Sequence, residues 1–252
     1  MAPPVFHFAP LPGNGGRVTL DGAEGRHAAT VRRIRAGERV LLTDGHGGIA
    51  DCTVTATARD ALELLVNERR EVAEPTPRVT VVQALPKGER SDLAVELATE
   101  AGADAIIPWQ AQRCVARWEG PKGDKGVRRW QATSAQAAKQ SRRPYVPEVG
   151  DLHSTAQLAA LVGHTVAAGG RALVLHESAQ TPLTALSFAV PAVLLVVGPE
   201  GGIDDDELSA LTTRGAAAVH LGPTVLRTST AAAVTLGALG VLTPRWRDAP
   251  GV

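Results

Sequence analysis

The alternation of strands with helices along residues 79–242 constrains the fold of this chain more than any other feature of its sequence. Short apolar runs occupy 79–85, 105–109, 172–177, 192–198 and 217–222. Helical patterns lie between them: one from Ser91 to Gly102, others near 127–141 and 155–168, one from Asp204, and an alanine-rich one from about residue 228. Such alternation is typical of a parallel sheet with helices on its faces. We therefore predict an α/β fold for this part of the chain.

The first 72 residues follow a different pattern. Residues 17–22 and 38–58 alternate apolar and polar side chains around Asp-Gly and Gly-Gly turns, which is typical of β-hairpins. We predict short strands throughout this region and a small β-barrel. The proline-containing stretch 73–78 is expected to be a linker, so we divide the chain into a β-barrel domain, 1–73, and an α/β domain, 78–252.

The strand at 192–198 runs into a loop with the composition of a ligand site. Gly198, Pro199, Glu200, Gly201 and Gly202 form the loop, and four acidic residues follow at 204–207. A strand, a tight loop and a helix start are the usual place for a cofactor in α/β proteins. The spacing of an aspartate at 204 and a glutamate at 207 predicts a capping box at the start of the helix.

The ligand of this loop is not expected to carry phosphate. A phosphate loop needs a lysine followed by serine or threonine, and a dinucleotide site needs G-x-G-x-x-G; this stretch has neither. Its acidic helix start would also repel a pyrophosphate. A neutral or cationic ligand fits better, and an ordinary turn is the alternative interpretation.

Two further loops follow predicted strands, at 175–178 and 221–233. Open α/β sheets bind ligands at the carboxyl ends of their strands, so three such loops predict one pocket. Its backbone groups could bind an adenine edge, and its apolar side chains could enclose the ring. Arg227 is one of only five basic residues after position 143. It is either a functional residue or a surface arginine that caps a carbonyl.

Charge is unevenly distributed along the chain. The formal net charge is zero, so no global field indicates nucleic acid binding. Residues 109–143 nevertheless hold nine lysines and arginines against Glu119 and Asp124. This basic segment predicts a local contact with a polyanion, although a solvated helix face would have the same composition.

Cysteine content and the N-terminus indicate the compartment. Cys52 and Cys114 are too few and too far apart for a zinc site or a disulfide framework, so we predict no metal and two reduced thiols. The first ten residues lack the basic and apolar segments of a signal peptide. The longest apolar stretches fall short of the ~18 residues that a membrane span needs. We expect a cytoplasmic protein.

The glycine-containing loops carry a specific resemblance to a known family. Residues 194–208, LLVVGPEGGIDDDEL, and 221–239, LGPTVLRTSTAAAVTLGAL, resemble the paired motifs of the RsmE family, SPOUT-superfamily methyltransferases that modify small-subunit ribosomal RNA. Residues 27–40 resemble its N-terminal RNA-binding motif, 96–108 a helix and strand, and 140–149 a basic loop. Many members have glutamate where this chain has Ser229, which we interpret as a helix-capping position.

This resemblance implies a PUA-like barrel followed by a SPOUT domain whose C-terminal segment forms a trefoil knot. It also implies a homodimer, with substrate entering between the subunits, and S-adenosylmethionine as cofactor. A sulfonium cation tolerates acidic surroundings that would expel a pyrophosphate. The implied cofactor-binding residues are Leu175, His176, Glu177, Val197, Gly198, Pro199, Glu200, Gly201, Gly202, Leu221, Gly222, Leu226 and Thr228.

The reaction that the resemblance implies is methylation at N3 of a uridine in 16S rRNA, within the small ribosomal subunit. Loss of the N3 proton leaves negative charge on the flanking carbonyl oxygens, and a fixed guanidinium would stabilise that charge. Arg227 is the candidate. Because the cofactor is an activated donor, alignment would supply most of the rate. None of the histidines lies in an obvious catalytic motif, so we assign no general base.

RNA is expected to contact two groups of arginines. Arg32, Arg33 and Arg35 belong to the barrel domain, and Arg113, Arg142 and Arg143 to the basic segment. Phosphate contacts position an RNA and do not specify its sequence, so specificity is expected to lie in the shape of the ribosomal site. Two alternatives stay open: a SPOUT methyltransferase that acts on tRNA, and a catalytically inactive RNA-binding relative.

Overall fold

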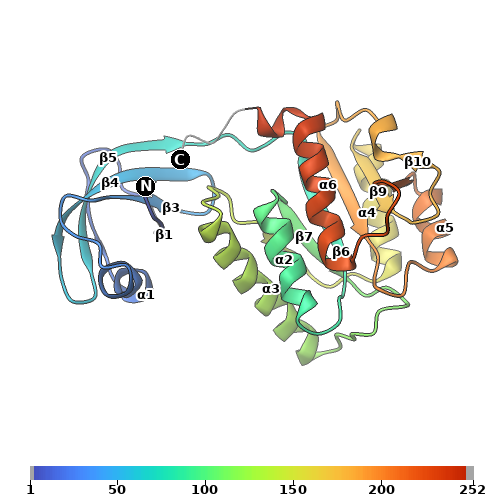
Figure 1. The fold of residues 1–252 in the computed structure, drawn as a ribbon, viewed down its shortest axis with the longest axis horizontal. Helices are drawn as coiled ribbons and strands as arrows, with labels where there is room; N and C mark the ends of the chain where they lie inside the picture. Colours follow the sequence, from blue (N-terminus) through green and yellow to red (C-terminus); the bar gives the residue numbers. More distant parts are fainter. Residues whose placement is uncertain (1–2, 248–252) are drawn as a thin grey trace. The chain divides into compact units, whose positions relative to one another are not determined.

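The computed structural model describes residues 3–247, which form two compact units (Figure 1). Within the described range, unit 1 comprises 3–74 and 138–146, and unit 2 comprises 75–137 and 147–247. The first division, after Glu74, lies within the stretch 73–78 that the sequence marks as a linker. A short segment of the basic region therefore belongs to the same unit as the N-terminal strands.

Unit 1 is built on a five-stranded sheet in the order β1-β3-β4-β5-β2. The strands are β1 Val5–His7, β2 Arg17–Leu20, β3 Arg39–Thr43, β4 Gly48–Thr57 and β5 Leu62–Glu71. The pairs β3–β4, β4–β5 and β2–β5 are antiparallel. The hairpin predicted for residues 38–58 is confirmed, whereas the one predicted for 17–22 is wrong, because β2 pairs with the distant β5 and Asp21 leads into a helix. The sheet has two different edge strands, β1 and β2, and forms a PUA-like half-barrel around a core that includes Phe6, Leu42 and Leu64.

Residues 22–31 are helical, and the prediction of strands throughout 1–72 is wrong there. Helix α1, Gly22–Arg26, continues into a π-helical turn, His27–Val31. The residue before α1 makes no side-chain cap, and one short turn carries no apolar period that sequence could reveal. Tertiary packing fixes the segment instead: a Cβ at Gly25 would lie 2.4 Å from the carbonyl oxygen of Leu20.

The segment 138–146 is bound to unit 1 by side chains and backbone. Lys139 Nζ lies 2.7 and 2.8 Å from the two carboxylate oxygens of Glu24, and Tyr145 donates its hydroxyl to the carbonyl of Val72 at 2.7 Å. These contacts span more than 70 residues of sequence. They explain why the end of a helix from the basic region joins the N-terminal unit.

Unit 2 contains a seven-stranded sheet in the order β10-β12-β9-β11-β6-β7-β8, with every pairing parallel. The strands are β6 Arg78–Ala84, β7 Ala105–Trp109, β8 Glu148–Val149, β9 Arg171–Leu175, β10 Thr181–Pro182, β11 Ala192–Val197 and β12 Ala217–His220. The inner strands are rich in valine and leucine and are buried, as expected for a sheet covered on both faces. The predicted α/β fold with a parallel sheet is confirmed.

Five helices accompany this sheet. They are α2 Arg90–Glu100, α3 Pro121–Gln140, α4 Thr155–Ala167, α5 Asp205–Thr213 and α6 Thr228–Leu242. Helices α2 and α6 pack side by side on one face, with α4 on the other beside α5 (Figure 1). Near α2, Trp130 of α3 is fully buried and donates its indole N–H to the hydroxyl of Ser91.

Helix boundaries differ from the predicted ones in two places. Helix α2 begins one residue before Ser91. The Ser91 hydroxyl does not cap the helix and accepts the indole N–H of Trp130 instead. Helix α3 begins at Pro121, six residues before the predicted start, because its glycine-containing first turns hide the helical period. The two-residue strands β8 and β10 are too short to be recognised from sequence.

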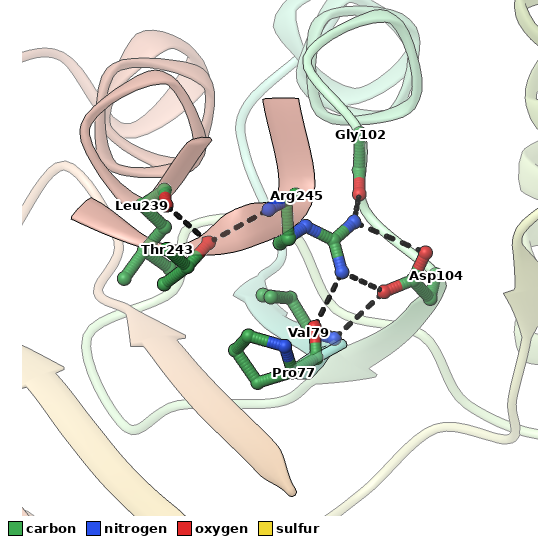
Figure 2. Close-up of polar contacts among 7 residues, drawn as sticks. All are labelled: Pro77, Val79, Gly102, Asp104, Leu239, Thr243 and Arg245. Atoms are coloured by element: carbon green, nitrogen blue, oxygen red, sulfur yellow. Dashed lines mark hydrogen bonds and ion pairs between the residues drawn. The ribbon is translucent and has the colours of Figure 1, made fainter. Parts of the chain in front are cut away.

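The end of the described chain is fixed to the beginning of the sheet. After α6, the short turn Pro244–Trp246 places the side chain of Arg245 against the first part of the sheet. Its guanidinium donates to the carbonyls of Pro77 and Gly102, and its Nη1 lies 2.7 Å from Oδ2 of Asp104 (Figure 2). The carboxylate also accepts the backbone N–H of Val79 at 2.7 Å. This buried cluster joins the segments before β6, before β7 and after α6.

Cys52 and Cys114 are free and buried. Burial, with a smaller contribution from the Asp51 carboxylate, raises the pKa of the Cys52 thiol to about 12. Both are therefore protonated near neutral pH, because burial also raises the pKa of Cys114. Within residues 3–247, no helix has both the length and the apolar character needed to cross a membrane.

Candidate functional site

A cavity of about 480 Å³ lies at the carboxyl ends of β9, β11 and β12. We call it the loop pocket, because its walls are the loops 175–177, 197–203 and 219–228. Parallel strands end at the same edge of a sheet, so the three loops meet although the carboxyl ends of their strands lie 22 or more residues apart in the sequence. All thirteen residues that the resemblance assigns to cofactor binding line this pocket.

The glycines of the 198–202 loop allow close packing. A Cβ at Gly198 would lie 2.6 Å from Cγ1 of Ile203, and a Cβ at Gly201 would lie 3.1 Å from Cβ of Arg113. Gly202 has a φ of +75°, a backbone conformation that is unfavourable for residues with a Cβ. Gly201 is thus required by the neighbouring 110–114 loop, and not only by space for a ligand.

Helix α5 starts at this loop with the predicted capping box. Asp204 accepts the N–H of Asp206 at 3.1 Å, and Glu207 accepts the N–H of Asp204 at 3.4 Å. Glu207 is buried and also accepts the N–H of Gln112 at 2.9 Å and the hydroxyl of Thr155 at 2.7 Å. One carboxylate therefore joins the loop after β7, the start of α4 and the start of α5.

The charges of the loop pocket are mixed, with acidic groups in excess. Glu177, Glu200 and Asp205 contribute carboxylates, and Arg113 contributes a guanidinium. Such a set accommodates a ligand with cationic centres better than a polyphosphate. Its volume is within the range of about 300–1,000 Å³ that is typical of small-molecule sites.

The structure places Arg227 at the start of α6, between two lining residues, Leu226 and Thr228. Its own side chain is exposed and is not part of the pocket wall. Its carbonyl accepts the N–H groups of residues 230 and 231, and its side chain makes no capping hydrogen bond. Ser229 is buried in the first turn, one residue inside the helix, so its interpretation as the capping residue is wrong.

The predicted RNA-binding arginines fall into two groups. Arg32, Arg33 and Arg35 are exposed residues that follow the π-helical turn of unit 1, and Arg142 and Arg143 lie in the 138–146 segment of the same unit. Arg113 belongs to unit 2, where it lines the loop pocket and forms an ion pair with Asp204 at 3.0 Å.

Two contacts of the site escaped the sequence analysis. The backbone N–H of Lys87, in the loop after β6, donates to the Glu200 carboxylate at 3.2 Å, and Arg113, in the loop after β7, reaches the pocket wall. Both loops follow predicted strands. The rule that placed three loops at the site would have included these two as well.

Family models match both parts of the chain. Residues 73–240 match the RNA methyltransferase domain, and residues 20–67 match the RNA methyltransferase PUA domain.

Curated relatives cover nearly the whole chain. Ribosomal RNA small subunit methyltransferase E of Mycobacterium bovis is 56% identical over 243 residues, which is 96% of this chain and 93% of that protein. The protein of the same name from Bacillus subtilis is 32% identical, covering 89% of this chain and 90% of its own length.

Solved structures agree. Ribosomal RNA small subunit methyltransferase E from Neisseria gonorrhoeae, bound to S-adenosylmethionine, has a TM-score of 0.84 and 26% identity, covering 96% of this chain and 98% of that one. A methyltransferase from Legionella pneumophila, in complex with the same cofactor, has a TM-score of 0.83 and 25% identity, covering 96% and 98%. With its glycine loops meeting at one pocket and its relatives matched along nearly their whole length, this chain belongs to the ribosomal RNA small subunit methyltransferase E (RsmE) family.

Proposed function

We propose that this chain transfers the methyl group of S-adenosylmethionine to N3 of a uridine in 16S rRNA. As a member of the RsmE family it is an S-adenosylmethionine-dependent rRNA methyltransferase; the position on the base and the residue roles are our proposal. The observation that carries it is the loop pocket, in which all thirteen implied cofactor residues come together. Its substrate, ribosomal RNA, makes the cytoplasm the expected compartment.

The residues of the loop pocket fit the cofactor. Gly222 has a φ of +152° with no atom within 4 Å of a built Cβ, so its backbone borders open space in a conformation that other residues rarely adopt. Backbone groups of residues 198–202 and 221–222 would hold the adenosine part, and the pocket's carboxylates suit its cationic centres. When bound, the cofactor supplies a methyl group that the sulfonium already activates.

The chain contributes alignment and charge stabilisation. Arg227 stands between two pocket residues with its side chain exposed to an incoming substrate. Negative charge develops on the uracil oxygens when N3 loses its proton, and we assign to the Arg227 guanidinium the role of stabilising that charge. The enclosing loops would orient base and cofactor. For an activated methyl donor, this alignment supplies much of the reduction in the activation free energy.

We assign the contacts with RNA phosphates to unit 1. Arg32, Arg33 and Arg35 would make them from the PUA-like domain that we assign to 1–73, and Arg142 and Arg143 from the attached segment. Removing two such contacts, with Arg142→Ala and Arg143→Ala together, would reduce the salt slope of RNA binding by about one per contact. An unchanged slope would show that these arginines are a solvated face.

We further propose that the protein is a homodimer. Helix α6 and the turn after it expose Val234, Val241, Leu242 and Trp246, of which Val241 is 76% exposed. Apolar residues gathered in this way favour a protein interface. Val241→Glu is expected to convert the dimer to a monomer in light scattering after size exclusion, whereas Val31→Glu, at a valine of unit 1 that is 64% exposed, is expected to leave the mass unchanged.

The trefoil knot is proposed for the segment that carries the loop pocket. The support for it is that α6 packs against α2, an early helix of unit 2, while the loops before α5 and before α6 line one cavity. An experimental structure traced continuously through residues 192–242 would test the threading.

The experiment that tests the function is transfer of a labelled methyl group to defined RNAs. Purified protein is incubated with small ribosomal subunits, free 16S rRNA and tRNA, and the modified nucleoside is identified by mass spectrometry. We expect 3-methyluridine in 16S rRNA only. Label in tRNA would support the alternative tRNA enzyme, and cofactor binding without transfer to any RNA would support an inactive relative.

A further inference from the structure

We propose that Arg113 binds the carboxylate of the methionine part of the cofactor, and so selects S-adenosylmethionine by its amino-acid end. This inference rests on the proposed function, because it assumes that the loop pocket holds this cofactor. It gives Arg113 a role different from the RNA contact that its basic segment suggested.

The charge inventory of the loop pocket points to this arginine. Among the described residues that line it, Arg113 is the only lysine or arginine, and Glu177, Glu200 and Asp205 line the same cavity. The cofactor has two cationic centres, its sulfonium and its ammonium, and one anion, its carboxylate. The acidic residues favour the cations and repel the anion. The guanidinium of Arg113 is a permanent positive charge in the pocket wall that can offset that repulsion.

The position of Arg113 suits a carboxylate partner. Its side chain lies along the 201–202 loop: a Cβ at Gly201 would be 3.1 Å from its Cβ, and a Cβ at Gly202 would be 4.0 Å from its Nη1. Nη2 is 3.0 Å from Oδ2 of Asp204. Within the described part of the chain Nε and Nη1 have no hydrogen-bond partner, and the side chain is 48% exposed. An anchored guanidinium with unused donors is a preformed site for a bidentate anion.

The loop that carries Arg113 is held firmly. The preceding residue, Gln112, donates its N–H to buried Glu207 at 2.9 Å and accepts a hydrogen bond from Arg117 Nη2 at 2.8 Å. Glu207 in turn caps α5 next to the 198–202 loop. The arginine and the glycine loop are thus fixed relative to each other before ligand binds, which lowers the entropy cost of the contact.

Ligands with and without the carboxylate test the inference. S-adenosylhomocysteine keeps the amino-acid end, whereas methylthioadenosine lacks it and keeps the adenosine and the sulfur. Binding of both is measured by calorimetry to the wild type, Arg113→Gln and Arg113→Lys. The matched control is Arg128→Gln, which removes an exposed arginine of the basic segment outside the pocket wall.

Arg113→Gln is expected to weaken binding of S-adenosylhomocysteine by about tenfold or more, while methylthioadenosine binding stays within about twofold of wild type. The affinity of Arg113→Lys for S-adenosylhomocysteine should fall between those of the wild type and Arg113→Gln, because lysine keeps the charge and loses the planar guanidinium. Arg128→Gln should change neither affinity.

Three results would overturn the inference, and a fourth concerns the proposed function instead. Equal weakening of both ligands would show that Arg113 only supports the loop. Unchanged affinities with weaker RNA binding would return it to the RNA-contacting set, and unchanged affinities with unchanged RNA binding would leave it no role in recognition. Failure of the wild type to bind either ligand would refute the cofactor assignment itself. Intact methylthioadenosine binding by a variant shows at the same time that its pocket is folded.

Discussion

Arg33 and Arg142 carry local backbone strain. They are the non-glycine residues with positive φ among residues 3–247, at 55° and 57°. A left-handed conformation costs a residue with a Cβ about 1–2 kcal/mol, and such strain often marks functional positions. Both arginines belong to the predicted RNA-binding set. Strain and function can be separated by comparing alanine with glycine at one position.

At position 142 we expect glycine to be more stable than alanine by about 1 kcal/mol, because alanine keeps the Cβ that makes this φ unfavourable. At position 35, an exposed arginine without positive φ, the order should reverse. Urea unfolding of the four variants measures both differences. If alanine is the more stable residue at 142 as well, the strain is not present in solution. Both variants at 142 should weaken RNA binding equally if the side chain contacts phosphate.

Arg227 is the residue on which the proposed chemistry depends. Arg227→Lys keeps the charge but loses the planar guanidinium, so we expect the single-turnover rate to fall about a hundredfold with cofactor affinity intact. Stability should not change, since the side chain makes no capping hydrogen bond. Arg214→Lys, at an exposed arginine near the end of α5, is the control. Reduced affinity with an unchanged rate would make Arg227 a cofactor ligand.

At the scale of elements, Glu207 holds three segments together. Its carboxylate accepts hydrogen bonds from the loop after β7, from α4 and from its own helix start. Glu207→Gln replaces one acceptor oxygen by a donor, so at least one of these donors loses its partner, at a cost of about 1–3 kcal/mol. Asp206→Asn, on the exposed side of the same helix, should change stability by less than about 0.5 kcal/mol.

Glu207→Gln should also disturb the loop pocket. Gln112 precedes Arg113, so a loosened loop should weaken S-adenosylhomocysteine binding together with stability. Chemical unfolding and calorimetry on one preparation measure the two effects. A loss of stability without any loss of affinity would show that the pocket does not depend on this carboxylate.

The elements that sequence predicts well are those with long, regular patterns. Strands β6, β9 and β11 are nearly continuous apolar runs, and α4 has a capping serine at its start, so each is confirmed within a few residues. The helical segment 22–31 was missed because contacts from residues 20 and 60 determine it, not its own period.

The loops that line the site could be predicted from the sequence, but the place of Arg113 in the pocket wall could not. Loops that follow parallel strands must meet at one edge, and the motifs of residues 198–202 and 221–228 identify two of them directly. Arg113 was assigned to RNA because its sequence neighbours are basic. Its actual neighbours, Gly201 and Asp204, lie about 90 residues away in sequence, and only the fold reveals them.

At the scale of the whole of unit 2, the buried cluster around Arg245 joins its beginning to its end. The side chains of Arg245 and Asp104 are 5% and 8% exposed, and the guanidinium also satisfies the carbonyls of Pro77 and Gly102 (Figure 2). Thr243 holds the turn in place by donating its hydroxyl to the carbonyl of Leu239 at 2.6 Å. This ion pair therefore adds to the apolar packing that holds α6, and with it the loop that enters α6, on the sheet.

Arg245→Ala is expected to destabilise the protein by about 3–5 kcal/mol, because it leaves a buried carboxylate without its counter-ion. Asp104 would still accept the N–H of Val79, but it would lose the charge and the hydrogen bonds of the guanidinium. Arg247→Ala, two residues further on and exposed, should behave like the wild type. Urea unfolding measures these differences, and a loss below about 1 kcal/mol would mean that the end of α6 is held by its apolar packing alone.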